Sequence, residues 1–444
     1  MKHSVIIKNL VLLSLISASV NPAFAHVNGQ GTYRVEITMT PAEREALKAN
    51  KKTEVAEANF KVYAAGELKD EEQVSVSSRG QSSLAHFPRK NLSVKVLKSE
   101  DGEKKKLKVG EIKGKHFTLS SSPEDQLFVK NSIGYSLLKA IGIHSLETQF
   151  AEVELNGQSQ GLYMLTENQS EVLMKEKDAD IVIRRRYNDD LEVKDSKKEL
   201  SEADVLKYQT TLRNLHKSIR ELSGDQLIAT LEKNLNLKNY LKWLAFNYII
   251  KNGDYSDEVY FFGKKNSAGE IYFDVSPWDL DDSFSADMHL SSFPKGPNYH
   301  MTENSQKQMI YNYESRIDRK VAGDAKLLRM YFAAMDEVVS TLSQKDVLYK
   351  IQQEVIANLS PYLDDADIQA AGLLDSVQTR HERAAVEDNV KVKMAKINLR
   401  MQEVKEELEV IKTEENINHR VLDLSGLRKV LIKIDNVLLR TVTK

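Results

Sequence analysis

Acidic residues gather where one predicted strand ends. The run Pro277-Trp278-Asp279-Leu280-Asp281-Asp282 follows an apolar strand that ends near Val275. Clustered carboxylates repel one another, and this cost is usually tolerated where a hard cation such as Mg²⁺ lies between them. A solvated acidic turn is the simpler interpretation of the same residues. The neighbouring Trp278 and the apolar strand favour a partly buried metal site at Asp279 and Asp281.

A second polar segment, Asn252 to Glu258, lies between an apolar helical stretch and a predicted strand. Asp254 has the place of a catalytic-loop aspartate, because a metal-binding acid follows it after a β-hairpin, as in the protein-kinase core. A turn at the end of a helix, favoured by Asn252-Gly253-Asp254, explains these residues equally well. Both interpretations stay open on this segment alone.

A third segment combines one glycine with several hydroxyl side chains. Residues 77–83 precede Phe87-Pro88-Arg89-Lys90 and a strand that carries Lys95. Backbone N–H groups and hydroxyls of such a loop can contact phosphates, and a lysine on the following strand can supply a positive charge. A surface turn with a basic flank is the alternative interpretation.

The elements that must position these residues begin with strands. Alternation of β-branched and aromatic residues with polar ones predicts strands of a half-exposed sheet. The predicted strands cover residues 32–40, 59–64, 74–76 and 92–96. A helix is expected to open at Pro123-Glu124-Asp125, with Ser122 as its cap, and to stop at Gly142.

The strongest local signal is a hairpin. Asn156-Gly157 separates two alternating runs, which predicts paired strands over residues 151–165. From about residue 201 the apolar period changes to 3.6, so the second half should be mainly helical. Helices are expected at 201–218, 225–234 and 237–252, and short strands at 259–262 and 270–273. Residues 285–318 lack a clear period and predict a long loop, functional or disordered.

The composition limits the class of protein. A chain of 444 residues, 41% hydrophobic, can form one large domain or two or three smaller ones. The absence of cysteine excludes disulfides and thiolate metal sites. A formal net charge of −2 gives no support to nucleic-acid binding. The histidines lack metal-ligand spacing, which disfavours metal-dependent hydrolysis. Arg184-Arg185-Arg186 is expected to form a solvated or salt-bridged strand end.

Residues 1–25 predict a secretory signal peptide. Lys2 and Lys8 frame the start of an apolar run, which ends in the small-residue pattern Ala23-Phe24-Ala25. This run is shorter than the roughly 20 residues that span a bilayer. We expect cleavage after Ala25, no integral membrane segment thereafter, and export to the periplasm, the cell surface or the medium. An uncleaved membrane anchor is the alternative.

The chain from residue 385 to 444 has the pattern of a long amphipathic or coiled-coil-like helix. Apolar residues recur there at spacings of three and four among dense lysine and glutamate. Packing against the rest of the chain or self-association is the expected role.

These segments together resemble the spore coat protein H (CotH) kinase-like family in order and spacing. The likeness covers roughly residues 32–290. It is carried by Arg79-Gly80-x-Ser82-Ser83, Phe87 to Lys95, Val153 to Gly157, Gly161 to Glu167, and Pro277 to Asp281. The family has an atypical protein-kinase-like fold, so the resemblance implies an α+β, two-lobed domain. The implied units are a domain at 26–384, with an N-lobe at about 30–167 and a C-lobe at about 168–384, followed by the helical extension at 385–444.

The resemblance also implies a role for each segment. The implied nucleotide-binding residues are Arg79, Gly80, Ser82, Ser83 and Glu167. Lys90 or Lys95 would hold the phosphates, and Asp254 would orient or deprotonate the acceptor hydroxyl. Asp279 would coordinate Mg²⁺, with Asp281 beside it.

One position departs from the family. After the catalytic-loop aspartate the family often has an asparagine, where this chain reads Asp257-Glu258-Val259. A carboxylate of Asp257 or Glu258 could replace that asparagine as a metal ligand, at the cost of added negative charge.

The implied function is therefore an ATP- and Mg²⁺-dependent kinase that phosphorylates hydroxyl side chains of a secreted or surface protein, with Mn²⁺ or Ca²⁺ as alternative metals. The competing interpretation is a catalytically inactive structural or binding module of the cell surface or extracellular matrix. It is favoured by the missing asparagine, by the scarcity of ATP outside the cytoplasm and by the helical extension.

Overall fold

The computed structural model describes residues 32–421 with several gaps. The gaps are 81, 99–101, 103–104, 124, 126, 187–188, 286–306, 314, 364, 367, 369, 371–382 and 415–416. The predicted signal peptide, most of the predicted loop at 285–318 and the end of the chain lie outside the described residues, as does the side chain of Ser82.

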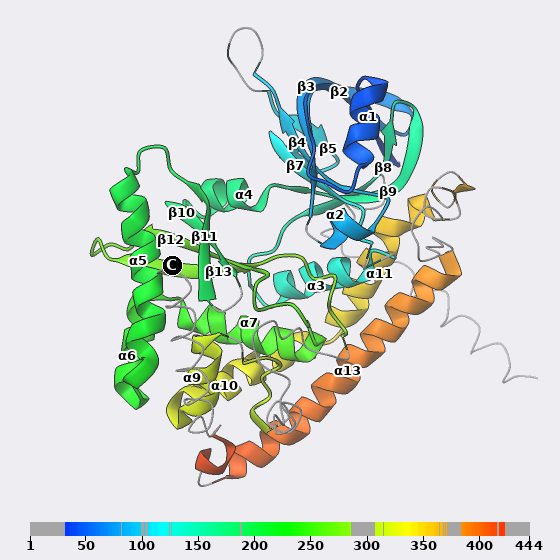
Figure 1. Ribbon diagram of the computed structural model, residues 1–444. Helices are drawn as coiled ribbons and strands as arrows, with labels where there is room; N and C mark the ends of the chain where they lie inside the picture. Colours follow the sequence, from blue (N-terminus) through cyan, green and yellow to red (C-terminus); the bar gives the residue numbers. More distant parts are fainter. Residues whose placement is uncertain are drawn as a thin grey trace, which may run out of the picture.

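The first part of the chain forms a closed barrel (Figure 1). Its strands are β1 (Tyr33–Thr38), β2 (Glu54–Ala64), β3 (Glu67–Arg79), β4 (Asn91–Val96), β7 (His116–Ser120), β8 (Thr148–Leu155) and β9 (Gln158–Glu167). They pair in the order β1-β2-β3-β4-β7-β9-β8, and a parallel pairing of β1 with β8 closes the ring. The predicted strands lie within β1, β2, β3 and β4. They were predicted as part of a half-exposed sheet, and the closure of that sheet into a barrel was not predicted.

Alternate side chains of each strand fill the barrel. Val35, Ile37, Val74, Val76 and Val94 are fully buried in one apolar cluster, while their neighbours in sequence point outward. This alternation is what a small barrel requires, because every strand has one interior and one exterior face. The outward face of β3, β4, β7 and β9 is thereby free to form the wall of a site.

Short elements complete the barrel. They are α1 (Pro41–Lys48), α2 (Ser82–His86), and the hairpin β5 (Leu107–Val109) and β6 (Ile112–Gly114). The predicted hairpin is confirmed as β8 and β9, with Asn156 and Gly157 both at positive φ, as their turn requires. The Asn156 amide also pairs with both backbone groups of Met39, which ties this turn to the end of β1.

The helix predicted from Pro123 begins later than expected. It is α3 (Val129–Ala140), and the carboxylate of Asp125 accepts hydrogen bonds from the backbone N–H groups of Val129, Lys130 and Asn131. Asp125 therefore caps the helix from outside its first turn, and Ser122 is not the cap. Gly142 follows the end of α3 at φ +77°, as predicted.

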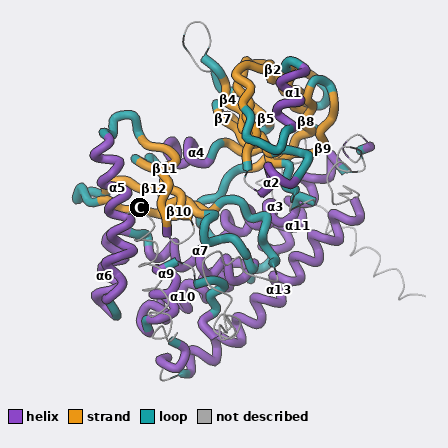
Figure 2. The backbone as a smooth tube through the Cα atoms, in the orientation of Figure 1, coloured by secondary structure: helices purple, strands orange, loops and turns teal. Residues whose placement is uncertain are grey.

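The second part of the chain contains a four-stranded antiparallel sheet surrounded by helices (Figure 2). Its strands, in spatial order, are β11 (Asp190–Ser196), β10 (Ile181–Arg186), β12 (Val259–Lys265) and β13 (Ile271–Pro277). The helices are α4 (Gln169–Glu176), α5 (Glu202–Ser218), α6 (Gly224–Asn234), α7 (Leu237–Ile250), α9 (Arg316–Gly323), α10 (Ala325–Leu342) and α11 (Val347–Leu359), with 3₁₀ turns at Ile219–Glu221, Ser360–Tyr362 and Ile417–Arg420. The predicted helices α5, α6 and α7 and the strands β12 and β13 are confirmed.

The expected tail helix is α13 (Arg383–Thr413), and it packs along the body of the molecule (Figure 1). One stripe of α13, including Val390, Ile397 and Val404, is buried in the same apolar cluster as α7 and α10. Its polar side also makes contacts, since the Arg400 guanidinium lies 4.2 Å from the Tyr248 ring centroid. This apolar stripe is therefore used within the chain.

None of the helices in the described residues is long and apolar enough to cross a membrane.

Candidate functional site

A cleft of about 1230 Å³ lies between the barrel and the four-stranded sheet. Its size is sufficient for a drug-sized or nucleotide-sized ligand. It collects nine of the predicted site residues, namely Arg79, Gly80, Ser83, Glu167, Asp254, Asp257, Glu258, Asp279 and Asp281. The three separate sequence segments thus meet at one place.

Three carboxylates form the centre of the cleft. Asp254, Asp257 and Glu258 each offer an oxygen, and these oxygens lie within 4.8 Å of one another. They follow α7, which Lys251 ends at φ +50°. The Asn252 side chain then accepts from the N–H of Asp254, so the turn favoured by this sequence is present and presents the acids to the cleft.

The acidic turn rests on a buried polar network. Arg185, only 1% exposed, donates to the carbonyl of Ser256 at 2.7 Å and to the Tyr240 hydroxyl at 2.9 Å. Tyr240 donates in turn to Oδ1 of Asp318 at 2.6 Å, and the Tyr255 hydroxyl lies 3.1 Å from Oδ2 of the same carboxylate. Burial raises the pKa of Asp318 to about 6. Because these buried hydrogen bonds join Arg185 both to the backbone of the turn and to the Tyr240–Asp318 pair, they fix the turn that carries the acids.

Arg184 holds two of the acids in place. One terminal nitrogen of its guanidinium lies 3.1 Å from Oδ2 of Asp257 and 3.1 Å from Oε1 of Glu258. Each carboxylate has a second oxygen, Oδ1 of Asp257 and Oε2 of Glu258, which is buried and has no hydrogen-bond partner in the part of the chain that the structure describes. These are acceptor oxygens of the kind that hard divalent cations bind. The donor set therefore fits a Mg²⁺ or Ca²⁺ ion.

The electrostatics of the cluster agree with this fit. Burial raises the pKa of Glu258 well above its usual range, Arg184 opposes the rise, and the charges of Asp279, Asp257 and Asp254 add to it. Like charges at close range disfavour ionisation, and a bound cation would reverse that effect.

The segment after β13 brings Asp279 and Asp281 to the same cleft. Asp279 has φ +47°, and its N–H donates to the Tyr135 hydroxyl at 3.3 Å. The next N–H, of Leu280, donates to Oδ1 of Asn131 at 2.8 Å. A Cβ atom on Gly134 would lie 2.4 Å from Leu280, so this glycine lets the segment approach α3 closely. The segment that carries Asp279 and Asp281 is therefore positioned by α3.

Trp278 connects the segment to both walls. Its ring stacks on Tyr260 with centroids 5.5 Å apart, and the guanidinium groups of Arg184 and Arg79 lie 4.8 and 5.7 Å from its ring centroid. Arg79 also donates to the Thr118 hydroxyl on β7. The cation–π contacts hold Arg79, a barrel residue, over the acidic side of the cleft.

The glycine-containing turn lies at the mouth of the cleft. Gly80 has φ +109°, and a Cβ there would lie 2.0 Å from the Ser83 hydroxyl oxygen, so only glycine fits this turn. Gly80 and Ser83 line the cleft as predicted.

The two predicted lysines are not among the residues that line the cleft. Lys90 is 4% exposed, and its ammonium group donates to Oδ1 of Asn50 and to the carbonyls of Leu84 and Phe87. Lys95 is exposed on the outer face of β4. The turn that Lys90 stabilises already encloses its charge in this structure, and the contact of Lys90 or Lys95 with phosphate stays a prediction.

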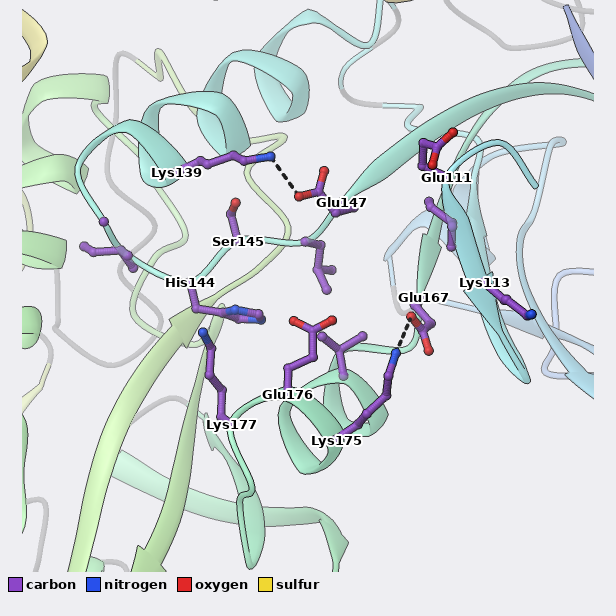
Figure 3. A pocket seen from close by; sticks show the side chains of 15 residues that line it. Glu111, Lys113, Lys139, His144, Ser145, Glu147, Glu167, Lys175, Glu176 and Lys177 are labelled. Atoms are coloured by element: carbon purple, nitrogen blue, oxygen red, sulfur yellow. Dashed lines mark hydrogen bonds and ion pairs between the residues drawn. The ribbon is translucent and has the colours of Figure 1, made fainter. Parts of the chain in front are cut away.

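Glu167 contributes to the cleft from the end of β9, but its carboxylate is turned away. Figure 3 shows this carboxylate facing Lys175 among the side chains that line a second cavity. That cavity has a volume of about 490 Å³, and Oε2 of Glu167 lies 3.9 Å from Nζ of Lys175. Burial raises the pKa of Glu167, and Lys175 opposes the rise. The Glu167 side chain thus forms an ion pair with Lys175, and the end of β9 faces the cleft.

Several residues of the site were missed or misjudged from the sequence. Arg184, expected at a solvated or salt-bridged strand end, forms salt bridges there and is a half-buried counter-ion of the acid cluster, a role that was not predicted. The strand alternation offered a signal, because it sends Arg184 and Arg186 to one face and Arg185 to the other. Asn131 and Tyr135 lie four residues apart on α3 and had no signal beyond that spacing.

Similarity to a known protein family extends over most of the chain. The model of the family described as CotH kinase protein matches residues 76–414. Inner spore coat protein H of Bacillus subtilis (strain 168) is 26% identical over 184 residues, which are 38% of this chain and 50% of that protein. The chain thus spans half the length of that curated relative. The family match also extends through α13, beyond the residues 32–290 that carried the resemblance.

Two solved structures align with the chain at low similarity. The Shewanella oneidensis MR-1 toxin–antitoxin complex of HipA, HipB and operator DNA has a TM-score of 0.32 and 13% identity, covering 71% of this chain and 66% of that one. The Helicobacter pylori proinflammatory kinase CtkA has a TM-score of 0.30 and 10% identity, covering 66% of this chain and 91% of that one. Scores of this size do not establish a common fold. The family match covers well over half of the sequence, and the chain therefore belongs to the CotH kinase protein family.

Proposed function

We propose that this protein is an exported kinase that uses ATP and a divalent cation, Mg²⁺ before Mn²⁺ or Ca²⁺, to phosphorylate hydroxyl side chains of a secreted or surface protein. The observation that carries the proposal is the pair of buried acceptor oxygens, Oδ1 of Asp257 and Oε2 of Glu258, without partners in a nucleotide-sized cleft. Unpaired buried acceptors are unfavourable unless a ligand completes them. Family membership supports the same reaction class.

In the proposed kinase the chain would form two lobes with the cleft between them. Residues at about 30–167, which include the barrel, would form the N-lobe, and residues at about 168–384 would form the C-lobe. Export rests on the predicted signal peptide at residues 1–25 and accords with the spore coat relative. A surface or matrix protein is the proposed partner class.

Each residue of the cleft would have one task in phosphoryl transfer. Asp279 and the free oxygens of Asp257 and Glu258 would hold the cation, and Arg79 would lie over the phosphates from the barrel side. When bound, the cation would neutralise charge on the phosphate oxygens. Asp254 would orient the acceptor hydroxyl and take its proton as the new oxygen–phosphorus bond forms and the bond to the leaving ADP breaks. Positioning and charge neutralisation account for the catalysis.

Transfer of labelled phosphate tests this proposal. Purified mature protein incubated with labelled ATP and Mg²⁺ should label itself or an added surface protein. The Asp279→Ala variant should lose this labelling, and equal labelling by the variant would overturn the assignment of the site.

A non-catalytic module is the second candidate, and one observation favours it. Arg184 already pairs with both Asp257 and Glu258, so the acid cluster is partly neutralised without a metal. An inactive protein should gain no thermal stability from ATP with Mg²⁺, Mn²⁺ or Ca²⁺, because only a ligand that prefers the native state raises its stability.

A further inference from the structure

Gln169 is a buried polar residue in the wall of the cleft that the proposed reaction does not use. It is the first residue of α4, directly after the strand end at Glu167 and the helix cap Asn168. It is 6% exposed and lines the cleft. Gln169 thus lies two residues after Glu167, which the resemblance counts among the nucleotide-binding residues.

The orientation of the Gln169 amide is fixed by its neighbours. Its nitrogen lies 3.0 Å from the carbonyl oxygen of Pro277, 3.3 Å from that of Ser276 and 2.7 Å from the Ser276 hydroxyl. Carbonyl oxygens can only accept hydrogen bonds, so the NH₂ group must face them and a flipped amide is excluded. The other end of the amide, Oε1, is therefore an oriented acceptor.

This acceptor has no partner among the described residues. Oε1 of Gln169 is buried from water and receives no hydrogen bond from that part of the chain. A buried acceptor left in this state costs more than the hydrogen bond itself would contribute, so a ligand that brings a donor gains the difference. Because Oε1 is shielded, a ligand reaches it only after a small adjustment of the lining side chains, as commonly accompanies binding.

We propose that Oε1 of Gln169 selects the nucleotide base, by accepting a hydrogen bond from the exocyclic amino group of adenine. This inference rests on the proposed function. Adenine carries a donor at its 6-position, whereas hypoxanthine and guanine carry an acceptor oxygen there, which would face Oε1 without a hydrogen between them. Sites that leave a buried polar group unpaired discriminate strongly against the wrong ligand. The residue would therefore distinguish 6-amino from 6-oxo purines.

The test compares ATP with inosine triphosphate, which bears a 6-oxo in place of the 6-amino group and a hydrogen on N1, where adenine has an acceptor. Dissociation constants are measured with Mg²⁺ on the whole mature protein, its Gln169→Leu variant and its Ser276→Ala variant. In the unaltered protein ATP should bind roughly 10- to 100-fold more tightly than inosine triphosphate. In Gln169→Leu the ratio should fall close to one, and in Ser276→Ala, which keeps Oε1, it should stay high.

The ratio separates base selection from a structural role. A variant that only loosens the cleft weakens both nucleotides alike and leaves the ratio unchanged, which would overturn the inference. Equal binding of both nucleotides by the unaltered protein would overturn it too, and the proposed ATP-dependent function would stand. Absence of binding by either nucleotide would overturn the proposed function and this inference with it. If Gln169→Leu does not fold, the ratio in the unaltered protein alone decides.

Discussion

Arg184 donates to Oε1 of Glu258 at 3.1 Å, while Oε2 of that carboxylate is buried without a partner. The same guanidinium nitrogen donates to Oδ2 of Asp257, and Oδ1 of Asp257 is likewise buried without a hydrogen-bond partner among the described residues. One arginine thus fixes two acids and keeps an oxygen of each available. Arg184 reduces the repulsion between the carboxylates and still leaves one oxygen of each to bind a cation.

Removal of this counter-ion should make stability depend on metal. Arg184→Gln leaves two buried carboxylates without their cation, and breaking such a pair costs about 3–5 kcal/mol. Urea unfolding should show this loss, and millimolar Mg²⁺ should restore part of it. Arg186→Gln is the control, because Arg186 lies farther from Asp257, at 3.8 Å, and should cost less. A loss that Mg²⁺ does not change would contradict a cation site here.

Substitution of Lys90 and of Lys95 should affect the free energy of unfolding to different extents. The Lys90 ammonium is enclosed by Asn50, Leu84 and Phe87, so Lys90→Met should lower the free energy of unfolding by about 1.5–3 kcal/mol. Lys95→Met, at an exposed position, should change it by less than about 0.5 kcal/mol. Denaturant titration measures both. A Lys90 variant of normal stability that has lost nucleotide binding would return this lysine to the site.

Helix α13 should contribute to folding stability as part of the core. Ile397 is fully buried in the stripe that faces the body, so Ile397→Ala should cost about 2–4 kcal/mol. Leu399, two residues away and 57% exposed, is the matched control, and its change to alanine should stay within about 0.5 kcal/mol. Equal, small effects of both changes would mean that α13 is not docked. Sedimentation would then show whether it mediates self-association.

His144 should make stability fall in acid. It lines the second cavity (Figure 3), where burial, aided by Lys177, lowers its pKa to about 4 from an ordinary 6.5. Between these values the unfolded chain binds the proton more readily, so the folded state loses stability as the pH falls from about 6.5 to about 4. The full loss is on the order of 3 kcal/mol.

The difference in unfolding free energy between the protein and its His144→Gln variant, measured across this pH range, isolates the effect. Other titrating groups are common to both proteins and cancel. A pH-independent difference for His144→Gln would refute the assignment.

Local signals in the sequence identified most of the elements. The Asn156-Gly157 turn, the apolar period of α7 and the strands β12 and β13 were predictable because each depends on residues close together in the chain. The barrel closure was not predictable, since the parallel pairing of Arg34 with Glu152 and Val35 with Val153 joins distant segments without a local pattern.

The candidate site was predictable to a similar extent. The acids at 254, 257, 258, 279 and 281 could be assigned by resemblance, because order and spacing along the chain carry them. Arg184 and Gln169 could not, since their roles depend on partners more than 70 residues away, at Asp257 and Pro277. The surroundings of Lys90 were not predictable either, because a backbone turn that encloses an ammonium group leaves no compositional signature.

Binding of ATP with Mg²⁺ tests the central claim most directly. Thermal unfolding should shift upward with saturating ATP and Mg²⁺, because about 100 times the dissociation constant of a ligand adds roughly 2.7 kcal/mol to the native state. The Asp279→Asn variant should lose this shift, and Asp225→Asn, an exposed acid outside the cleft, should keep it. An identical shift in the Asp279→Asn variant, or no shift in the unaltered protein with any divalent cation, would contradict a nucleotide and metal site in this cleft.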